Sequence, residues 1–416
     1  MISFLISAIK IIFLLGFLIF IHELGHFTVA KLCKVRVNEF AIGFGPAIWK
    51  KQGKETKYAL RLIPLGGFVS MEGEEERSDN EHSFSKASIP KRIAIVIAGA
   101  TVNIIFAIIV YFALTAAEGT YISNEIDSII DGYAAQEIGL KSGDKVIQIN
   151  DKIIKSRKDL NNAVADVKDE KINLKINRDG EELEYNTNLT EVKSKSTGMY
   201  IDEKCKIIAI EKNSSAEKQG IKTNDEIIKI NNKEINGNRK EILNAISEEG
   251  TESIFITVKR EKDEISIELV PDYISNYYLG INLKEAPDTF INRCINGGME
   301  TQEFLFSIID NLKQLFTGNV GVDQMMGPVG ISETVAKTNG VREFIYMMAL
   351  ISLSLGITNL LPIPALDGGK ILILLIEALR RKPMKEKTEM TIQLLGFSLL
   401  IALSLYVTYN DILRIF

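Results

Sequence analysis

The residues His22-Glu23-Leu24-Gly25-His26 follow an almost uninterrupted apolar run, and the rest of the chain can be read outward from them. On a helix, side chains four positions apart lie on the same face, so His22 and His26 can direct two imidazoles at one metal ion. Glu23 stands beside them. In this His-Glu-x-x-His arrangement, two histidines bind zinc and the glutamate is the general base of a hydrolase. The alternative is a chance match, since only three positions of the pattern are fixed.

The apolar run before the motif extends from Ile2 to Ile21 and contains a single charged residue, Lys10. Twenty residues are about the length that a helix needs to cross the hydrocarbon core of a bilayer. A cleaved signal peptide is the competing interpretation. No basic segment precedes the run and no small-x-small cleavage site follows it, so a membrane-spanning helix is favoured.

Three further apolar blocks predict three more spanning helices, at Ile93 to Ala113, Phe344 to Leu361 and Thr391 to Tyr409. The second block carries Gly99 and Asn103 one turn apart, a pattern typical of a helix face that contacts another helix. A net charge of −5 over 416 residues does not indicate a nucleic-acid partner. We therefore expect the lipid bilayer, and no nucleic acid, among the partners of this chain.

The distribution of basic residues predicts the orientation. Twelve Lys and Arg lie between Lys31 and Arg92, and six more lie between Lys370 and Lys387. Basic loops stay in the cytoplasm, which places both chain ends and residues 118–341 outside. The same rule places His22 and His26 near the cytoplasmic side of the membrane.

The outer region contains an internal repeat. Gly139 to Ile154 aligns without gaps to Gly220 to Ile235 at an offset of 81 residues, with eight identities in sixteen positions. A repeat of this length is the size of a small domain, which predicts two tandem domains. The shared pattern resembles circularly permuted bacterial PDZ domains, and Gly198 to Ile201 and Tyr278 to Ile281 resemble their peptide-binding loops. PDZ domains bind extended peptides or peptide C-termini by strand addition; a spacer role is the alternative.

A catalytic zinc has three protein ligands, so a third ligand is needed beside the two histidines. Asp367 is the candidate, because it follows Asn359-x-x-Pro362-x-Pro364 at the end of the third span. An ionisable residue at membrane depth is a functional-site candidate by default. The alternative is that Asp367 caps the helix that resumes at Gly368.

Taken together, HELGH, the Asn-Pro-Asp-Gly motif, Gly99 to Asn103 and the paired repeats make essentially the whole chain resemble the site-2 protease family, in its bacterial branch with two PDZ domains. The resemblance implies that His22, His26 and Asp367 bind Zn²⁺ and that Glu23 activates water. It also implies that Asn359 holds the substrate or the developing oxyanion. Substrate would pair as a strand with the glycine-rich hairpin segments, including Gly66, Gly67 and Phe68. Lys370 departs from the pattern, since many members carry histidine there.

The expected fold is a multi-domain membrane protein with a four-helix transmembrane zinc protease core, membrane-associated β-hairpins and two tandem α+β PDZ domains. The expected boundaries are 1–117 for the first two spans, 118–203 and 204–285 for the PDZ domains, 286–341 for an amphipathic or re-entrant connector, and 342–416 for the last two spans.

The resemblance implies an intramembrane metalloendopeptidase of the bacterial inner membrane that acts in regulated intramembrane proteolysis. Its substrates would be single-span membrane proteins such as anti-sigma factors or remnant signal peptides. Two alternatives stay open. One is a catalytically inactive scaffold that presents PDZ domains to envelope proteins, and the other is a membrane metalloprotease that cuts soluble or surface-exposed chains.

Overall fold

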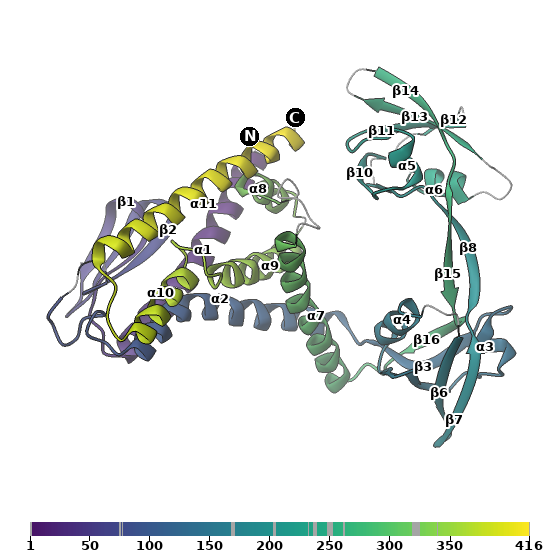
Figure 1. Ribbon diagram of the computed structural model, residues 1–416, viewed down its shortest axis with the longest axis horizontal. Coiled ribbons are helices and arrows are strands. Elements are labelled where there is room, and N and C mark those ends of the chain that lie inside the picture. Colours follow the sequence, from purple (N-terminus) through teal and green to yellow (C-terminus); the bar gives the residue numbers. More distant parts are fainter. Residues whose placement is uncertain are drawn as a thin grey trace. The chain divides into compact units, whose positions relative to one another are not determined.

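The computed structural model describes residues 2–74, 76, 78–167, 171–202, 205–231, 233–235, 239–247, 253–260, 263–317, 325–338 and 340–415 (Figure 1). The chain forms two compact units. The first combines Met1–Thr120 with Pro287–Phe416, and the second is Tyr121–Ala286. The first unit is helical with one β-hairpin, and the second is rich in strands.

The first unit contains seven helices among the described residues: α1 (Ile2–Leu32), α2 (Ile89–Glu118), α7 (Phe290–Phe316), α8 (Pro328–Ala336), α9 (Val341–Asn359), α10 (Asp367–Arg380) and α11 (Glu386–Ile415). Four of them are long and apolar enough to cross a membrane, over Ile6–Leu32, Ile89–Glu118, Val341–Asn359 and Glu386–Leu413. The four predicted spans are therefore confirmed, and the chain is a multi-pass membrane protein.

The first span is longer than the sequence suggested. The apolar run ends at Ile21, but α1 continues without a break to Leu32 and carries the His-Glu-x-x-His motif inside it. His22 is buried in spite of its polarity. The polar side chains are tolerated here because α1 packs against α2 and the hairpin along this stretch.

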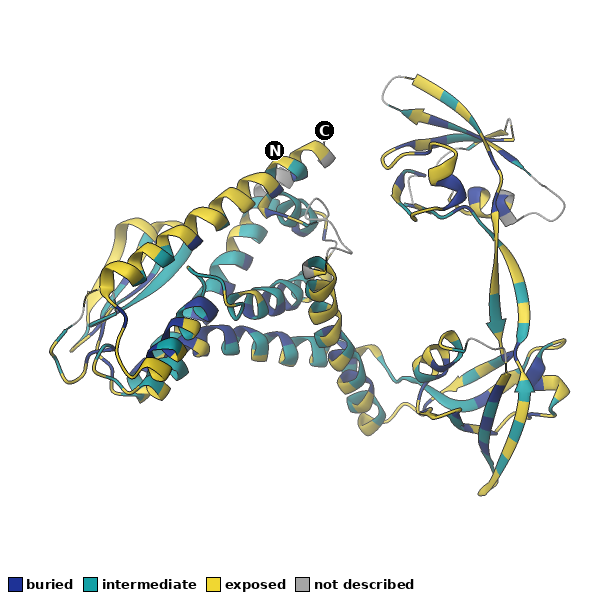
Figure 2. Ribbon diagram, viewed as in Figure 1, coloured by how far each residue is buried: buried dark blue, intermediate teal, exposed yellow. Residues whose placement is uncertain are grey.

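Exposure along α11 is that of a lipid-facing helix. Leu394, Leu395 and Leu405 are each about two-thirds exposed, and Figure 2 shows most of this helix as exposed surface. A soluble protein would bury such side chains, so their exposure is explained by contact with lipid.

The helix α2 lies at the centre of this unit and packs against α1, α7, α9 and α10. The expected amphipathic segment before the third span is α7, which begins nine residues earlier than the helical pattern from Met299 suggested. Phe304 of α7 is buried, and its ring stacks on Tyr111 of α2 with centroids 4.1 Å apart. One face of α7 is therefore held by α2.

The glycine-rich segments after the first span form a single long hairpin of β1 (Val37–Gln52) and β2 (Lys57–Met71). Residues Glu39 to Ile42 have partners on two sides, Lys57 to Leu60 and Gly67 to Ser70. Away from the helices the hairpin exposes large apolar side chains, including Phe44, Ile48, Trp49 and Leu62. The hairpin therefore carries an exposed apolar surface.

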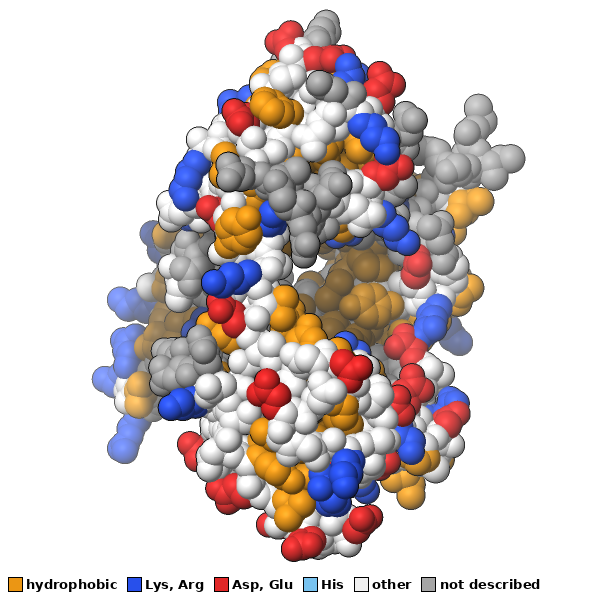
Figure 3. Space-filling model, turned by 90° about the vertical axis from the view of Figure 1, so that its right-hand side faces the viewer, with side chains coloured by type: hydrophobic (Ala, Val, Ile, Leu, Met, Phe, Trp, Pro, Cys, Tyr) orange, Lys and Arg blue, Asp and Glu red, His pale blue; other side chains and the backbone are white. Residues whose placement is uncertain are grey.

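The second unit contains two copies of one arrangement. The first copy has β3 (Ile122–Ile129), α3 (Ala134–Glu137), β4 (Lys145–Ile149), β5 (Lys152–Ile153), α4 (Arg157–Ala165), β6 (Lys171–Arg178) and β7 (Glu181–Asn188). The second has β10 (Ile207–Ile210), α5 (Ser215–Lys218), β11 (Glu226–Ile230), β12 (Lys233–Glu234), α6 (Arg239–Ser247), β13 (Ile254–Arg260) and β14 (Asp263–Leu269). Figure 3 shows charged side chains of both signs scattered over the face of this unit, as on a water-exposed surface.

The repeated aspartate of the sequence motif has the same structural role in both copies. Asp144 is buried and accepts two hydrogen bonds of 2.7 Å from the guanidinium of Arg178. Asp225 does the same with Arg260. The pKa of Asp144 is held below its usual value by the hydrogen bond from Arg178. The first pair joins the turn before β4 to the end of β6. The second pair joins the turn before β11 to the end of β13.

The two copies are nested rather than simply consecutive. Strands β8 (Thr190–Ser196) and β15 (Asp272–Tyr278) form a two-stranded ribbon. Beyond the ribbon, β9 (Met199–Ile201) pairs with β10 of the second copy, whereas β16 (Ile281–Glu285) returns to pair with β3 of the first. The boundary expected between residues 203 and 204 lies outside the described residues.

Candidate metal centre

Three side chains from the two ends of the chain converge on one point of the first unit. The Nε2 atoms of His22 and His26 lie 3.2 Å apart, and Asp367 Oδ2 lies 3.3 Å from the first and 3.6 Å from the second. Ligands about 2.0–2.1 Å from a tetrahedral zinc stand about 3.3 Å from one another. The triangle therefore has the dimensions of three zinc ligands.

The hydrogen-bonding state of these groups also favours a cation. His26 Nδ1 lies 2.8 Å from the backbone carbonyl oxygen of Ile95, which can only accept, so Nδ1 carries the proton. Nε2 of the neutral ring then presents a lone pair to the centre of the triangle. Asp367 Oδ2 is buried without a hydrogen-bond partner among the described residues. Acceptors facing one another at this distance repel unless a cation lies between them.

Two glycines allow α1 and α2 to approach closely at the histidines. A Cβ on Gly99 would lie 2.4 Å from His26 Nε2, and a Cβ on Gly25 would lie 2.6 Å from the carbonyl oxygen of Ala98. No real Cβ approaches other atoms so closely. Gly25 of α1 and Gly99 of α2 therefore both permit the close contact between these two helices.

Asp367 faces the histidines instead of capping its helix. It is the first residue of α10, the N-cap position is Leu366, and no side-chain cap is present there. The turn before α10 contains Pro362 and Pro364 and bends the chain sharply after α9. The capping interpretation is thus not supported, and the structure brings Asp367 to the two histidines as expected.

Glu23 lies beside the hairpin. A Cβ on Gly67 would stand 3.3 Å from Glu23 Cγ and 3.0 Å from the carbonyl oxygen of Ala41. Gly67 to Ser70 have one strand partner among the described residues, Glu39 to Ile42. The hairpin therefore brings a strand segment next to the motif glutamate.

The remaining residues expected at the site are Gly66, Phe68 and Asn359. Phe68 is adjacent to Gly67, and its ring lies 5.1 Å from the Arg61 guanidinium. Gly66 has a positive φ of 104° and packs on Phe44. Asn359 is the last residue of α9, and no described polar contact joins it to the three converging side chains.

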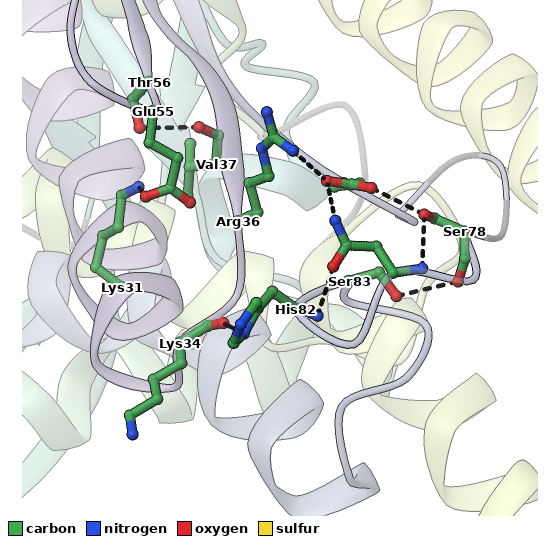
Figure 4. A network of polar contacts seen from close by, with 11 residues as sticks. Lys31, Lys34, Arg36, Val37, Glu55, Thr56, Ser78, His82 and Ser83 are labelled. Atoms are coloured by element: carbon green, nitrogen blue, oxygen red, sulfur yellow. Dashed lines mark hydrogen bonds and ion pairs between the residues drawn. The ribbon is translucent and has the colours of Figure 1, made fainter.

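The third histidine of the chain is elsewhere. His82 Nδ1 donates to the backbone carbonyl of Lys34 at 3.2 Å, within a polar network of the loop that follows the hairpin (Figure 4). Among the described residues, the one group of side chains that could hold a metal is His22, His26 and Asp367. His82 does not belong to that group.

Three further groups around the centre were given no role at the metal from the sequence. The Ile95 carbonyl leaves no side-chain signal, so no pattern could have identified it. Asn103 is completely buried with its Nδ2 atom 3.5 Å from His22 Nδ1; the sequence predicted a helix contact for this amide but not its place beside a histidine. Lys370 is paired with Glu74, with Nζ and Oε1 2.5 Å apart.

Comparisons with known proteins cover almost the whole chain. The family model of peptidase family M50 matches residues 10–403. The regulator of sigma E protease of Haemophilus influenzae is 30% identical over 446 residues, covering 99% of this chain and all of that protein. The regulator of sigma-E protease RseP of Escherichia coli is 28% identical over 455 residues, covering both chains completely.

One similarity to a solved structure covers a smaller part of this chain. The HtrA3 PDZ domain bound to a phage-derived ligand aligns with 21% of this chain and 93% of that one, at 16% identity and a TM-score of 0.19. The family is shown by the full-length matches and not by this local similarity. With its four spanning helices and its His-His-Asp cluster, the chain belongs to peptidase family M50, the site-2 proteases, and is a membrane zinc metalloprotease.

Proposed function

We propose that this protease cleaves single-span membrane proteins within their membrane segment, in regulated intramembrane proteolysis. The observation that carries the proposal is the location of the metal triangle. His22 and His26 lie within the first candidate span, and Asp367 follows directly after the third. A protease of soluble chains needs a site open to water, whereas both halves of this one adjoin apolar helices.

In this proposal His22, His26 and Asp367 hold Zn²⁺ and Glu23 is the general base. Bound zinc lowers the pKa of a coordinated water and polarises the scissile carbonyl. The Glu23 carboxylate takes a proton from the attacking water and returns it to the leaving amine. Its place on the helical turn that carries both histidines keeps it beside the reacting atoms. Asn359, at the end of α9, is proposed to hold the substrate carbonyl from the other side.

The hairpin can supply hydrogen-bond partners for the backbone of an unwound substrate helix. Every interior amide of a membrane helix is hydrogen-bonded, and in lipid an unpaired backbone group costs several kcal/mol. Cleavage therefore needs a partner for the backbone groups that unwinding frees. We propose that the segment from Gly66 to Phe68, which lies beside Glu23, pairs with the unwound substrate as an added strand.

The orientation in the membrane is part of the proposal. The basic loops between the first and second spans and after α10 are assigned to the cytoplasm by the positive-inside rule. Both chain ends and Tyr121–Ala286 would then lie outside the cytoplasm, in a bacterial inner membrane. The metal centre would be near the cytoplasmic side.

The second unit is proposed to bind extended segments or C-termini of substrates. A cavity of about 690 Å³ lies between α4 and the segment that joins β15 to β16, with Leu160, Val164, Leu279 and Ile281 among its lining residues. β16 is the edge strand of its sheet, so an added peptide can pair with it. The loop Tyr278 to Ile281 thus serves the groove of the first copy although it follows the second copy in sequence.

The nested pairing also suggests revised domain boundaries. In this proposal the first PDZ domain comprises residues 121–189 and 279–285, and the second comprises residues 197–271. The ribbon of β8 and β15 joins them. The connector 286–341 and the paired spans, 1–117 and 342–416, keep the boundaries expected from the sequence.

The proposal is tested by locating the cut. A reporter with one spanning helix and soluble segments on both sides is incubated with the purified protease in lipid nanodiscs, and the products are identified by mass spectrometry. Cleavage inside the apolar span is expected, and it should increase when helix-destabilising residues are placed in that span. Cleavage confined to the soluble segments would contradict the proposal.

A further inference from the structure

We propose that Asn103 is a positioning residue that selects the metal-binding tautomer of His22. The two histidines differ in what holds their outer ring nitrogens. His26 Nδ1 is held by a backbone carbonyl, that of Ile95, at 2.8 Å. His22 Nδ1 lies 3.5 Å from the Nδ2 atom of the Asn103 side-chain amide. Both holding groups belong to α2.

A backbone carbonyl and a side-chain amide impose different constraints. The carbonyl of Ile95 can only accept, so it fixes His26 with its proton on Nδ1. An amide can either donate through Nδ2 or accept through Oδ1. If Nδ2 donates to His22 Nδ1, the ring proton moves to Nε2, the atom that faces Asp367 and His26. That tautomer cannot bind a metal through Nε2.

The opposite orientation of the amide is compatible with a metal. A half-turn about the Cβ–Cγ bond of Asn103 directs Oδ1 at His22 Nδ1, which then donates its proton and leaves the Nε2 lone pair for the ion. The Oδ1 atom in its present orientation is buried without a hydrogen-bond partner, so the half-turn gives up no bond of the oxygen. Histidine ligands commonly donate their second N–H to such an acceptor.

The surroundings hold Asn103 in reach of the ring. Asn103 is 0% exposed, and its backbone carbonyl accepts a 2.9 Å hydrogen bond from the Ser352 hydroxyl of α9. Gly99, one turn earlier, lies directly against both imidazoles. The Gly99-x-x-x-Asn103 face of the second span therefore provides space for the two rings and an acceptor for one of them.

The inference is tested by zinc affinity, measured by chelator competition on the full-length protein in detergent. Asn103→Leu keeps the volume but removes the acceptor, and we expect zinc binding to weaken by about 10–100-fold. Asn103→Asp keeps an acceptor and should bind zinc within about threefold of wild type. Ser354→Ala removes a hydroxyl of the neighbouring helix that bonds the Leu350 carbonyl and not Asn103, so it is the matched control and should behave as wild type. Unchanged affinity in Asn103→Leu, or equal losses in the Leu and Asp variants, would overturn the inference.

A second measurement does not depend on the folding of any variant. The chain has only three histidines, so ¹⁵N spectra of histidine-labelled, zinc-loaded wild type can be resolved by residue. We expect His22 to bind through Nε2 with a protonated Nδ1. Binding through Nδ1 would contradict the role of Asn103. The inference rests on the proposed zinc site, which fails separately if the wild type binds no zinc.

Discussion

Arg92 Nη1 lies 2.9 Å from Glu377 Oε2, and this largely buried ion pair joins α2 to α10. The same two helices supply the groups around the metal centre, because α2 packs on the histidines and α10 begins with Asp367. Glu377 Oε1 also accepts the backbone N–H of Met384, at 2.6 Å. The pair is therefore a structural link between the two ends of the chain that form the site.

Removing one partner of this pair should destabilise the membrane unit. Arg92→Met leaves the Glu377 carboxylate buried without its cation, which costs about 3–5 kcal/mol. The double variant Arg92→Met/Glu377→Gln removes both charges and should recover most of that loss. Unfolding in mixed micelles with increasing SDS measures both. A single variant as stable as wild type would show that water replaces the lost cation.

Gly99 tests the close approach of the second span to the metal ligands. Gly99→Ala introduces a Cβ that would lie 2.4 Å from His26 Nε2, so the ring must move and zinc should bind at least tenfold more weakly. Gly298→Ala is the matched control, because a Cβ there meets nothing within 4 Å. Zinc content after dialysis against a weak chelator distinguishes the two. Equal zinc retention would contradict the packing described for this site.

A substitution at Gly67 tests whether the hairpin acts on the substrate rather than on zinc binding. A Cβ at this position presses on Glu23 Cγ and on the Ala41 carbonyl but touches no metal ligand. Gly67→Ala should therefore reduce kcat for a single-span reporter at least severalfold while zinc content stays at the wild-type level. Loss of zinc together with activity would mean that the hairpin supports the metal ligands rather than the substrate.

Acid should destabilise the second unit through its buried aspartates. The pKa of Asp144 is lowered in the folded protein by the hydrogen bond from Arg178. In an unfolded chain, the pKa of an aspartate is about 3.9. The ionised pair therefore stabilises the fold above about pH 4, and this contribution is lost as the pH falls through the lower folded pKa.

Asp144→Asn should accordingly lower stability at neutral pH and reduce the difference in stability between pH 7 and pH 3. Asp79→Asn removes a fully exposed carboxylate and should change neither. Circular dichroism of thermal unfolding at the two pH values measures the effect. An Asp144→Asn variant with the acid sensitivity of wild type would assign that sensitivity to other carboxylates.

The parts of the molecule that the sequence predicted are those encoded locally. Four apolar blocks predicted four spans, because a helix in lipid needs only length and hydropathy. His22 and His26 were recognisable because they lie four positions apart on one helix. Asp367 is distant in sequence, and it was found because a zinc site needs a third ligand and an aspartate beside two prolines at membrane depth is uncommon.

The parts that could not be predicted depend on pairing between distant segments. The loop Tyr278 to Ile281 was recognisable, but nothing in its sequence indicates that the strand after it pairs with β3 instead of a strand of the second copy. The extent of α1 as far as Leu32 was not predicted, because the polar motif ends the apolar run at Ile21. The Ile95 carbonyl that holds His26 could not have been predicted either, since any residue supplies the same backbone oxygen.

The most direct test of the zinc protease mechanism compares wild type with Glu23→Gln for cleavage of a single-span reporter, with bound zinc quantified in both proteins. The amide keeps the size of the side chain but cannot accept the proton of the attacking water. We predict that both proteins retain zinc and that only the wild type cleaves, with the activity of Glu23→Gln reduced at least 100-fold. Full activity in Glu23→Gln, or a folded wild type without zinc, would contradict the mechanism.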